Sequence, residues 1–120
     1  MPHYIDGFVL PVPKKQLAAY IKMSKTACKV WLDHGALEYR ECVGEDLSVK
    51  VGLPFPTGIK AKKGETIVFS WITYKSRAHR DRVNAKVMKD PRITEDMAHL
   101  EMPFDCARMM YGGFTTVVHG

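Results

Sequence analysis

Apolar and polar positions alternate along the chain in blocks that predict regular elements. An apolar run over residues 4–10 is followed by Pro11-Val12-Pro13, which predicts a buried strand and then a break. The next residues repeat apolar positions about every 3.6 residues, which predicts an amphipathic helix with Pro13 near its first turn and its end at Gly35. The predicted apolar stripe of this helix is Leu17, Tyr20, Ile21, Ser24, Ala27, Cys28, Trp31 and Leu32.

The middle of the chain predicts two strands separated by a long loop. Residues 37–43 alternate loosely between apolar and polar side chains, as in a strand with one wet face. Residues 44–65 are rich in Gly, Pro and charged side chains, and their length predicts an arm, a lid or a site of partner contact. Residues 66–74 carry no charge and have high β propensity, so we expect a central strand covered on both faces.

The last third of the chain predicts a second helix and a final strand. Ser76 is a suitable N-cap for a helix that runs to about Lys89 and stops at Asp90-Pro91. Residues 109–118 form the last strand, in which Gly112-Gly113 indicates a bulge or a close backbone approach. The order of elements predicts an α+β, ferredoxin-like βαββαβ fold with a four-stranded antiparallel sheet and two helices on one face.

The strand at residues 66–74 also bears on assembly. Its side chains are apolar or aromatic on both faces: Ile67, Phe69, Trp71, Val68, Ile72 and Tyr74. Two helices cover only one face of the sheet, so the other face needs a second cover. We expect an identical sheet from another copy to supply it, giving a symmetric homodimer whose interface the 44–65 arm can reach across.

Composition narrows the class of protein. The 120 residues suffice for a single domain over residues 1–120, and 46% of them are hydrophobic, which excludes a disordered chain. No apolar stretch approaches ~18 residues, so we expect no membrane span. The N-terminus shows no secretory signal, and three cysteines without C-x-x-C spacing do not suggest a disulfide framework; both favour a cytoplasmic protein.

The net charge of +5 is concentrated in the second helix. Residues 75–92 hold seven basic and two acidic side chains, whereas residues 93–120 hold one basic and four acidic ones. A basic helix favours RNA or another anion as an alternative partner, bound without sequence readout. The outward-facing basic residues of this alternative are Lys75, Arg82, Lys86 and Lys89.

Three polar side chains of the second helix share a side with its apolar positions. Arg77, Arg80 and Asn84 lie in the same half of the helical wheel as Val83. A guanidinium directed at an apolar face must be paired, either with a structural partner (Asp6, Glu38, Asp105 or a backbone carbonyl) or with an anionic or carbonyl-bearing ligand in a pocket. Asp6 itself is the one charge in an apolar strand, so it is either ion-paired or an acid–base group.

The histidines and short motifs add little chemistry. His34 lies at the end of the first helix, where it either interacts with the helix C-terminus or is, as an alternative to Asp6, the candidate proton-transfer group. No histidine pair has metal-ligand spacing, and there is no G-x-G-x-x-G, P-loop or G-x-S-x-G motif. We therefore expect no metal and no cofactor.

Several long stretches resemble the uncharacterised bacterial YbaA-like family. They are residues 4–14, the stretch WLDHGALEYRECVG at 31–44, the stretch FSWITYKSRAHRDRVNAKVM at 69–88, and Met102-Pro103-Phe104-Asp105 with residues 108–114. The resemblance implies membership of the dimeric α+β barrel superfamily, whose ligands sit in a cleft between sheet and helices. It implies no established activity, and no enzyme motif of that superfamily maps onto these residues.

Together these observations favour a cytoplasmic homodimer with a cleft that binds a small anionic or carbonyl-bearing organic molecule. A cofactor-free enzyme and a protein-interaction module without small-molecule chemistry stay open; nucleic acid is a partner only under the basic-helix alternative. The candidate ligand-binding residues are Asp6, His34, Trp71, Arg77, Arg80, Asn84 and Tyr111.

Overall fold

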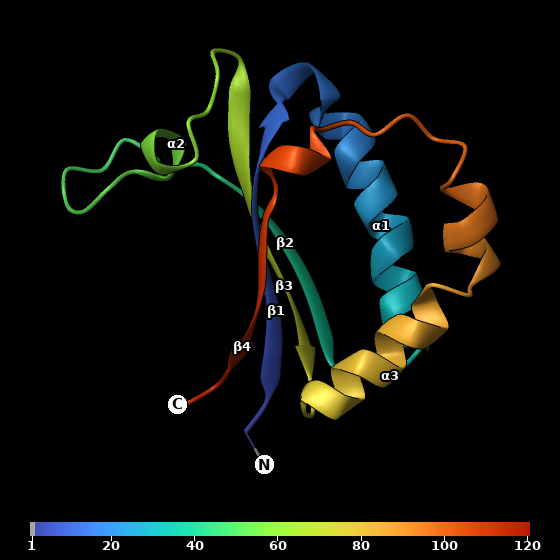
Figure 1. Ribbon diagram of the computed structural model, residues 1–120. Coiled ribbons are helices and arrows are strands. Elements are labelled where there is room, and N and C mark those ends of the chain that lie inside the picture. The colour runs from blue at the N-terminus through green and yellow to red at the C-terminus, as the bar shows by residue number, and fades with distance from the viewer. Residues whose placement is uncertain (1) are drawn as a thin grey trace.

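The computed structural model describes residues 2–120, which form a four-stranded antiparallel sheet with two long helices on one side (Figure 1). The strands are β1 (Tyr4–Pro13), β2 (Glu38–Val43), β3 (Glu65–Tyr74) and β4 (Met110–Thr115), in the spatial order β2-β3-β1-β4. The helices are α1 (Leu17–Asp33), α3 (Arg77–Val87) and the short α2 (Phe55–Gly58). The predicted ferredoxin-like arrangement is confirmed.

Strand β1 is longer than predicted, and the expected break at Pro11 does not occur. The strand continues to Pro13, and β4 pairs with it only as far as Val9. Lys14 N donates to Gly64 O across the β1–β3 boundary, at 2.8 Å. Neighbouring residues of a strand direct their amides to opposite sides, so the two proline nitrogens face the side that β4 leaves open.

Helix α1 buries a stripe that is rotated from the predicted one. Tyr20 and Ala27 are buried as expected, and the fully buried Val30 was missed. Ile21 and Leu32, predicted to be within the stripe, are exposed. The sequence pattern defines an apolar half of the helix, whereas the sheet covers only the part of that half that faces it.

Helix α3 begins where its capping residue predicts. The Ser76 side chain accepts a hydrogen bond from His79 N at 3.1 Å, and this bond satisfies one of the free amides of the first turn. Val83 and Val87 are the buried residues of the helix, which ends at Val87, two residues before the predicted end. The connection that follows includes a π-helical turn at Arg92–Asp96 and a 3-10 turn at Cys106–Arg108.

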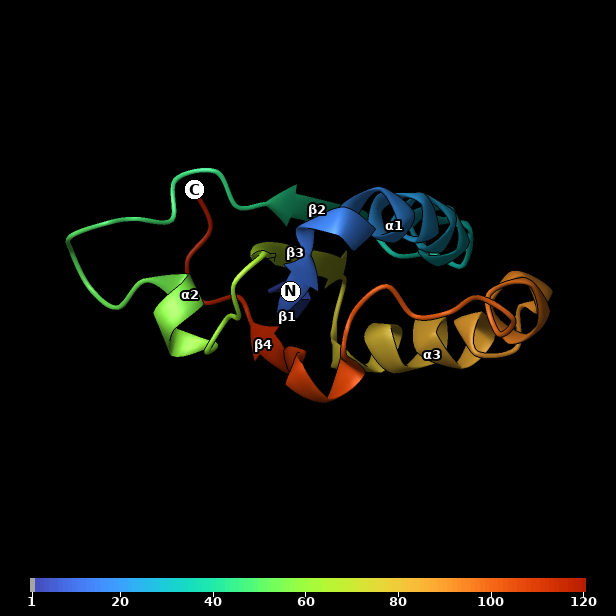
Figure 2. The same cartoon turned by 90° about the horizontal axis from the view of Figure 1, so that it is seen from above.

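The two faces of the sheet differ in cover. Both α1 and α3 lie on one face, whereas the 44–64 arm with α2 lies on the other side, as Figures 1 and 2 show. On this open face Phe69 is 45% exposed, although the ring of Phe55 in the arm packs edge to face against it, with the ring centres 6.2 Å apart. Within one chain β3 is therefore fully covered on one face only, and cover of the other face by a second copy stays a prediction.

The core on the covered face is divided into two clusters. One gathers around Val30, Tyr74 and Val83, where α1 and α3 approach each other. The other gathers around Leu10 and Tyr20, under the first half of α1. Phe8 of β1 packs against both clusters from between them. The face between the clusters is thus the place where a cavity can persist.

Strand β4 contains the expected glycine pair, and its reason is a close approach. The β1–β4 register runs without interruption through Gly112 and Gly113, so there is no bulge. A Cβ on Gly113 would overlap the Tyr4 hydroxyl and lie 2.7 Å from Tyr4 Cζ. A Cβ on Gly112 would lie 3.5 Å from the Phe114 ring, which is ordinary contact.

This difference gives a matched pair of variants. We expect Gly113→Ala to lower the free energy of unfolding by about 1–3 kcal/mol, because the Tyr4 ring must move. We expect Gly112→Ala to change it by less than about 1 kcal/mol. Urea denaturation followed by circular dichroism measures both, and equal effects of the two substitutions would contradict the close approach.

Candidate functional site

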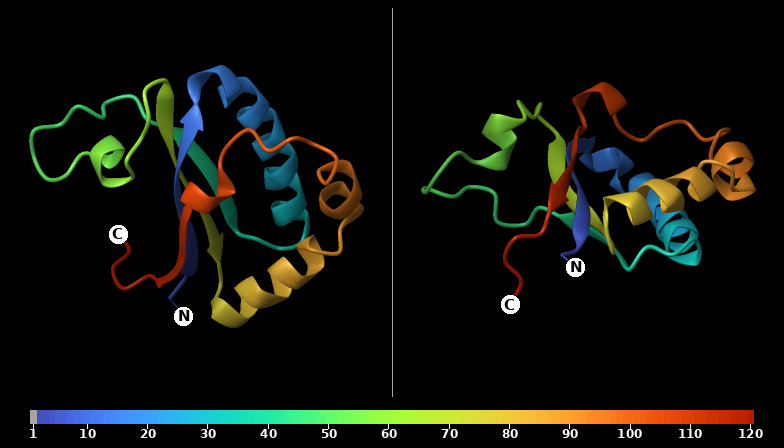
Figure 3. Two further views of the ribbon diagram at one scale, coloured as in Figure 1. Left: turned by 45° about the horizontal axis from the view of Figure 1, so that its top comes forward. Right: turned by 60° about the horizontal axis from the view of Figure 1, so that its bottom comes forward.

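A cavity of about 250 Å³ lies between α1, the covered face of the sheet and the segment that connects α3 to β4. We call it the inner cavity, and we call residues 92–109 the connecting segment. Figure 3 shows this segment returning past α1 toward β4. Its side chains Ile93, Met97, Met102, Phe104 and Met109 line the cavity. A cavity of about 150 Å³ is enough to hold benzene, so the inner cavity has room for a substituted ring.

The polar wall of the inner cavity is centred on Glu41. The Tyr20 hydroxyl donates to Glu41 Oε1 and the Tyr39 hydroxyl donates to Glu41 Oε2, both at 2.8 Å. Burial and the Glu41 charge raise the pKa of Tyr20 and of Tyr39 far above the usual value. Both tyrosines therefore stay protonated and act as hydrogen-bond donors that position the carboxylate.

The predicted residues Asp6, Arg80 and Tyr111 lie together at another place, between β1, β4 and α3. Arg80 Nη1 lies 2.8 Å from Asp6 Oδ1 and donates to the Tyr111 hydroxyl at 2.9 Å. The guanidinium also lies over the Tyr4 ring, 5.0 Å from its centre. Asp6 is only 1% exposed; burial raises its pKa, and the charge of Arg80 opposes that rise. This cluster has the geometry of the structural ion pair that the sequence left open.

Asn84 connects this cluster to the inner cavity. Its Oδ1 accepts hydrogen bonds from Trp31 Nε1 at 3.1 Å and from the Tyr74 hydroxyl at 3.3 Å. Trp31 lines the inner cavity, whereas Asn84 does not. Asn84 therefore orients the indole ring in the cavity wall.

The remaining predicted site residues are dispersed. Trp71 borders both the inner cavity and the hollow of the open face, and its Nε1 donates to Glu38 Oε1 at 2.9 Å on the open face. Arg77 is exposed on α3, contrary to the expected inward direction, because the wheel half that contains Val83 extends beyond the part that packs on the sheet. His34 lies at the far end of α1 beside Asp90. The structure does not gather the seven predicted residues into one site.

Of the residues that line the inner cavity, the sequence reasoning named only Trp71 as a site residue. Tyr20 was placed only on an apolar stripe, and Tyr39 and Glu41 only on a half-wet strand. The alternation in β2 puts Tyr39 and Glu41 on one face, but nothing in that alternation says which face the helices cover. The one signal available in the sequence was a tyrosine, Tyr39, two residues from the carboxylate of Glu41 in the same strand.

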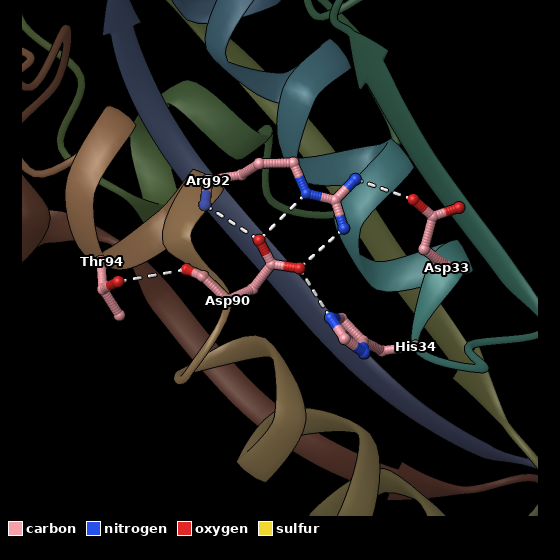
Figure 4. Close-up of polar contacts among 5 residues, drawn as sticks. All are labelled: Asp33, His34, Asp90, Arg92 and Thr94. Carbon is pink, nitrogen blue, oxygen red and sulfur yellow. Dashed lines mark hydrogen bonds and ion pairs between the residues drawn. The ribbon is translucent and has the colours of Figure 1, made fainter.

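The connecting segment is fixed at both ends by arginine–carboxylate pairs. At its start, Arg92 Nη2 lies 2.7 Å from Asp90 Oδ2, and Arg92 Nη1 lies 2.7 Å from Asp33 Oδ2 (Figure 4). His34 Nε2 lies 2.7 Å from the same Asp90 oxygen as Arg92 Nη2 (Figure 4). At its end, Arg108 donates to both oxygens of Glu65, at 2.6 and 2.9 Å. These pairs hold the segment over the inner cavity.

Comparison with known proteins identifies the family. The model of the family described as "Protein of unknown function (DUF1428)" matches residues 3–106. The chain belongs to this family. It is 41% identical over 115 residues to the uncharacterized protein YbaA of Escherichia coli K12, covering 96% of this chain and 97% of that protein. The uncharacterized protein YbaA of Shigella flexneri matches to the same extent.

A solved structure supports the fold. A dimeric ferredoxin-like protein from an uncultured marine organism superimposes with a TM-score of 0.67, over 100% of both chains, at 12% sequence identity. The resemblance expected from the sequence is thereby confirmed at the level of family and fold. No α-helix among residues 2–120 is long and apolar enough to cross a membrane, and these residues contain no cluster of three or more potential metal ligands.

The Asp90 pair predicts an acid-dependent loss of stability. Hydrogen bonds from Arg92 and His34 hold the pKa of Asp90 well below its usual value. Because an unfolded aspartate titrates near about 3.9, the stabilisation is complete above that pH and is lost as the pH falls below it. We expect Asp90→Asn to lower the melting temperature at neutral pH and to flatten its decline in acid.

The control for this experiment is Asp96→Asn, a change to an exposed carboxylate on the same segment. Melting curves recorded by circular dichroism over an acid pH series compare the three proteins. An Asp90→Asn variant with the wild-type acid slope would show that Asp90 is not the titrating anchor.

Proposed function

We propose that this protein binds a small organic molecule in the inner cavity. The observation that supports the proposal is an apolar hollow with a single inward carboxylate held by two tyrosine hydroxyls. Such a combination of apolar walls and few convergent polar groups is typical of small-molecule sites. The pairs Arg92–Asp33 and Arg108–Glu65 hold the connecting segment, which supplies part of the wall of the hollow.

The proposed site differs from the residues on which the sequence argument relied. An anionic or carbonyl-bearing ligand was expected because Arg77 and Arg80 were placed at an apolar interior. Arg80 is instead engaged by Asp6 and Tyr111, and neither arginine lines the inner cavity. The proposal therefore keeps the cleft between sheet and helices and no longer has an argument for an anion.

A variant that fills the cavity tests the proposal. Ala27 is buried on α1 and lines the cavity, so Ala27→Leu should occupy the space that a ligand needs. A ligand at about ten times its dissociation constant raises the free energy of unfolding by about 1.4 kcal/mol. We expect a panel of indole, benzylamine and benzyl alcohol to include compounds that raise the melting temperature of the wild type but not of Ala27→Leu.

The control is Ala18→Leu, which adds the same side chain at an exposed position of α1. This variant should respond to the compounds as the wild type does. No response of the wild type to any compound, or an equal response of Ala27→Leu, would contradict binding in the inner cavity.

We also propose that two copies of the chain pack through the open face. On this face Met110 and Phe114 are 58% and 60% exposed, and they border an apolar hollow of about 590 Å³ with Phe69 and Trp71. Apolar exposure of this extent on one face is typical of an interaction surface. The marine structural neighbour is described as dimeric.

Light scattering tests the dimer. We expect the wild type at micromolar concentration to have twice the 13.6 kDa chain mass, and Phe114→Lys to shift it toward the monomer, because a lysine ammonium in the interface would be desolvated without a partner. Leu32→Lys, at an exposed apolar residue of α1, should remain dimeric. A monomeric wild type would contradict the proposal.

A further inference from the structure

Five aromatic residues line the inner cavity besides Trp71, whose indole nitrogen is bonded to Glu38 on the open face. They are Phe8 of β1, Tyr20 and Trp31 of α1, Tyr39 of β2 and Phe104 of the connecting segment. The rings of Tyr20 and Phe104 meet edge to face at 5.6 Å, and those of Trp31 and Tyr39 meet at 6.2 Å. The negative faces of aromatic rings attract cations, and the attraction grows when the cation is desolvated.

The charge in the inner cavity is negative. Arg40 and Glu41 are the charged residues among the described lining. The Arg40 guanidinium is on the opposite face of the sheet, where it lies 5.5 Å from the centre of the Trp71 ring and pairs with Glu38. The Glu41 carboxylate is thus the charged group that faces the aromatic walls.

Glu41 has unused capacity to accept hydrogen bonds. Each of its oxygens accepts one tyrosine hydroxyl, whereas a carboxylate offers about four acceptor positions. A surface hollow between α1 and β2 shares Tyr20, Tyr39 and Glu41 with the inner cavity, and Lys25 lines only this outer hollow. The carboxylate therefore stands between the inner cavity and the outer hollow with lone pairs to spare.

We propose that the ligand of the inner cavity is an organic cation, an ammonium group attached to a compact apolar body. This inference rests on the proposed function and adds the chemical class of the ligand. Glu41 neutralises the ammonium, the aromatic rings surround it, and the methionines of the connecting segment enclose the apolar body. A carboxylate ligand would meet the Glu41 charge, and a neutral ligand would leave that charge uncompensated.

The ligand and the inner cavity are complementary in charge: the ligand brings the cation, and the cavity brings the carboxylate and the ring faces. A desolvated ammonium is costly to bury unless it is paired, and here it gains a carboxylate together with several ring faces. The Tyr20 and Tyr39 hydroxyls already hold the carboxylate in place, so little side-chain ordering is needed on binding. The four methionines at the cavity, Met23, Met97, Met102 and Met109, can adapt to the shape of the apolar body.

Four probes that share a benzyl or phenyl ring test the charge preference. Benzylamine and benzyltrimethylammonium carry a cation, benzyl alcohol is neutral and benzoate is an anion. Titration calorimetry at neutral pH measures each dissociation constant for the full chain. We expect both cations to bind at least about tenfold more tightly than benzyl alcohol, a difference of about 1.4 kcal/mol, and benzoate to bind most weakly.

The outcomes separate this inference from the proposed function. Equal or tighter binding of benzyl alcohol or benzoate would overturn the cation preference and leave small-molecule binding standing. Failure of all four probes to bind would overturn both. If benzylamine binds and benzyltrimethylammonium does not, recognition comes from hydrogen bonds to Glu41, and the proposed role of the aromatic rings is overturned.

A matched pair of variants locates the effect at Glu41. Glu41→Gln keeps the side-chain size and removes the charge, so it should weaken both cations at least about tenfold and leave benzyl alcohol nearly unchanged. Glu38→Gln makes the same change on the same strand but on the open face, and it should bind all probes as the wild type does. Equal losses in both variants would overturn the assignment to Glu41.

The two tryptophans of the chain give a readout that needs no variant. Both border the inner cavity, but the Trp71 indole nitrogen is on the open face, hydrogen-bonded to Glu38, whereas that of Trp31 is bonded to Asn84 on the covered side. In nitrogen-15 NMR spectra, we expect benzylamine to shift the Trp31 indole signal while that of Trp71 stays in place. A shift of the Trp71 signal alone would place the probe on the open face and overturn the proposal.

Discussion

Two arginine–carboxylate pairs hold the connecting segment over the sheet, and the inner cavity depends on them. Arg92 with Asp33 of α1 fixes the start of the segment, and Arg108 with Glu65 of β3 fixes its end. The Arg108–Glu65 pair is bidentate, which restricts geometry as well as adding attraction. Between these ends the segment covers the gap that α1 and α3 leave over the sheet. Without that cover the aromatic walls would be open to water.

The small number of helices explains why the two faces of the sheet differ. Two helices suffice for two core clusters on one face, with a cavity between them, and they leave the opposite face only partly covered by the arm. Polar groups inside the covered face are satisfied: in residues 2–120 no buried side-chain nitrogen or oxygen lacks a hydrogen-bond partner. The Asn84 bonds orient Trp31 in the wall of the inner cavity, and Glu41, which accepts two tyrosine hydroxyls, keeps spare acceptor capacity.

Local signals in the sequence predicted the elements well and the site poorly. Ser76 and Gly35 mark helix ends through short-range chemistry, so their positions follow from the residues alone. Whether the strand ends at Pro11 depended on where β4 stops, which is set by the tertiary structure and not by the local sequence. Whether Arg77 points inward depended on how much of the α3 surface packs on the sheet. Whether Glu41 points inward depended on which face of β2 the helices cover. Candidate sites built from periodicity alone inherit these ambiguities.

A crystal structure of the protein grown with benzylamine tests the central claim most directly. The account predicts ligand density in the inner cavity, with the amine nitrogen within hydrogen-bonding distance of the Glu41 carboxylate and the ring between α1 and the connecting segment. Density for the ligand on the open face, or a cavity filled by the side chains of Met102 and Phe104 with no ligand inside, would contradict it.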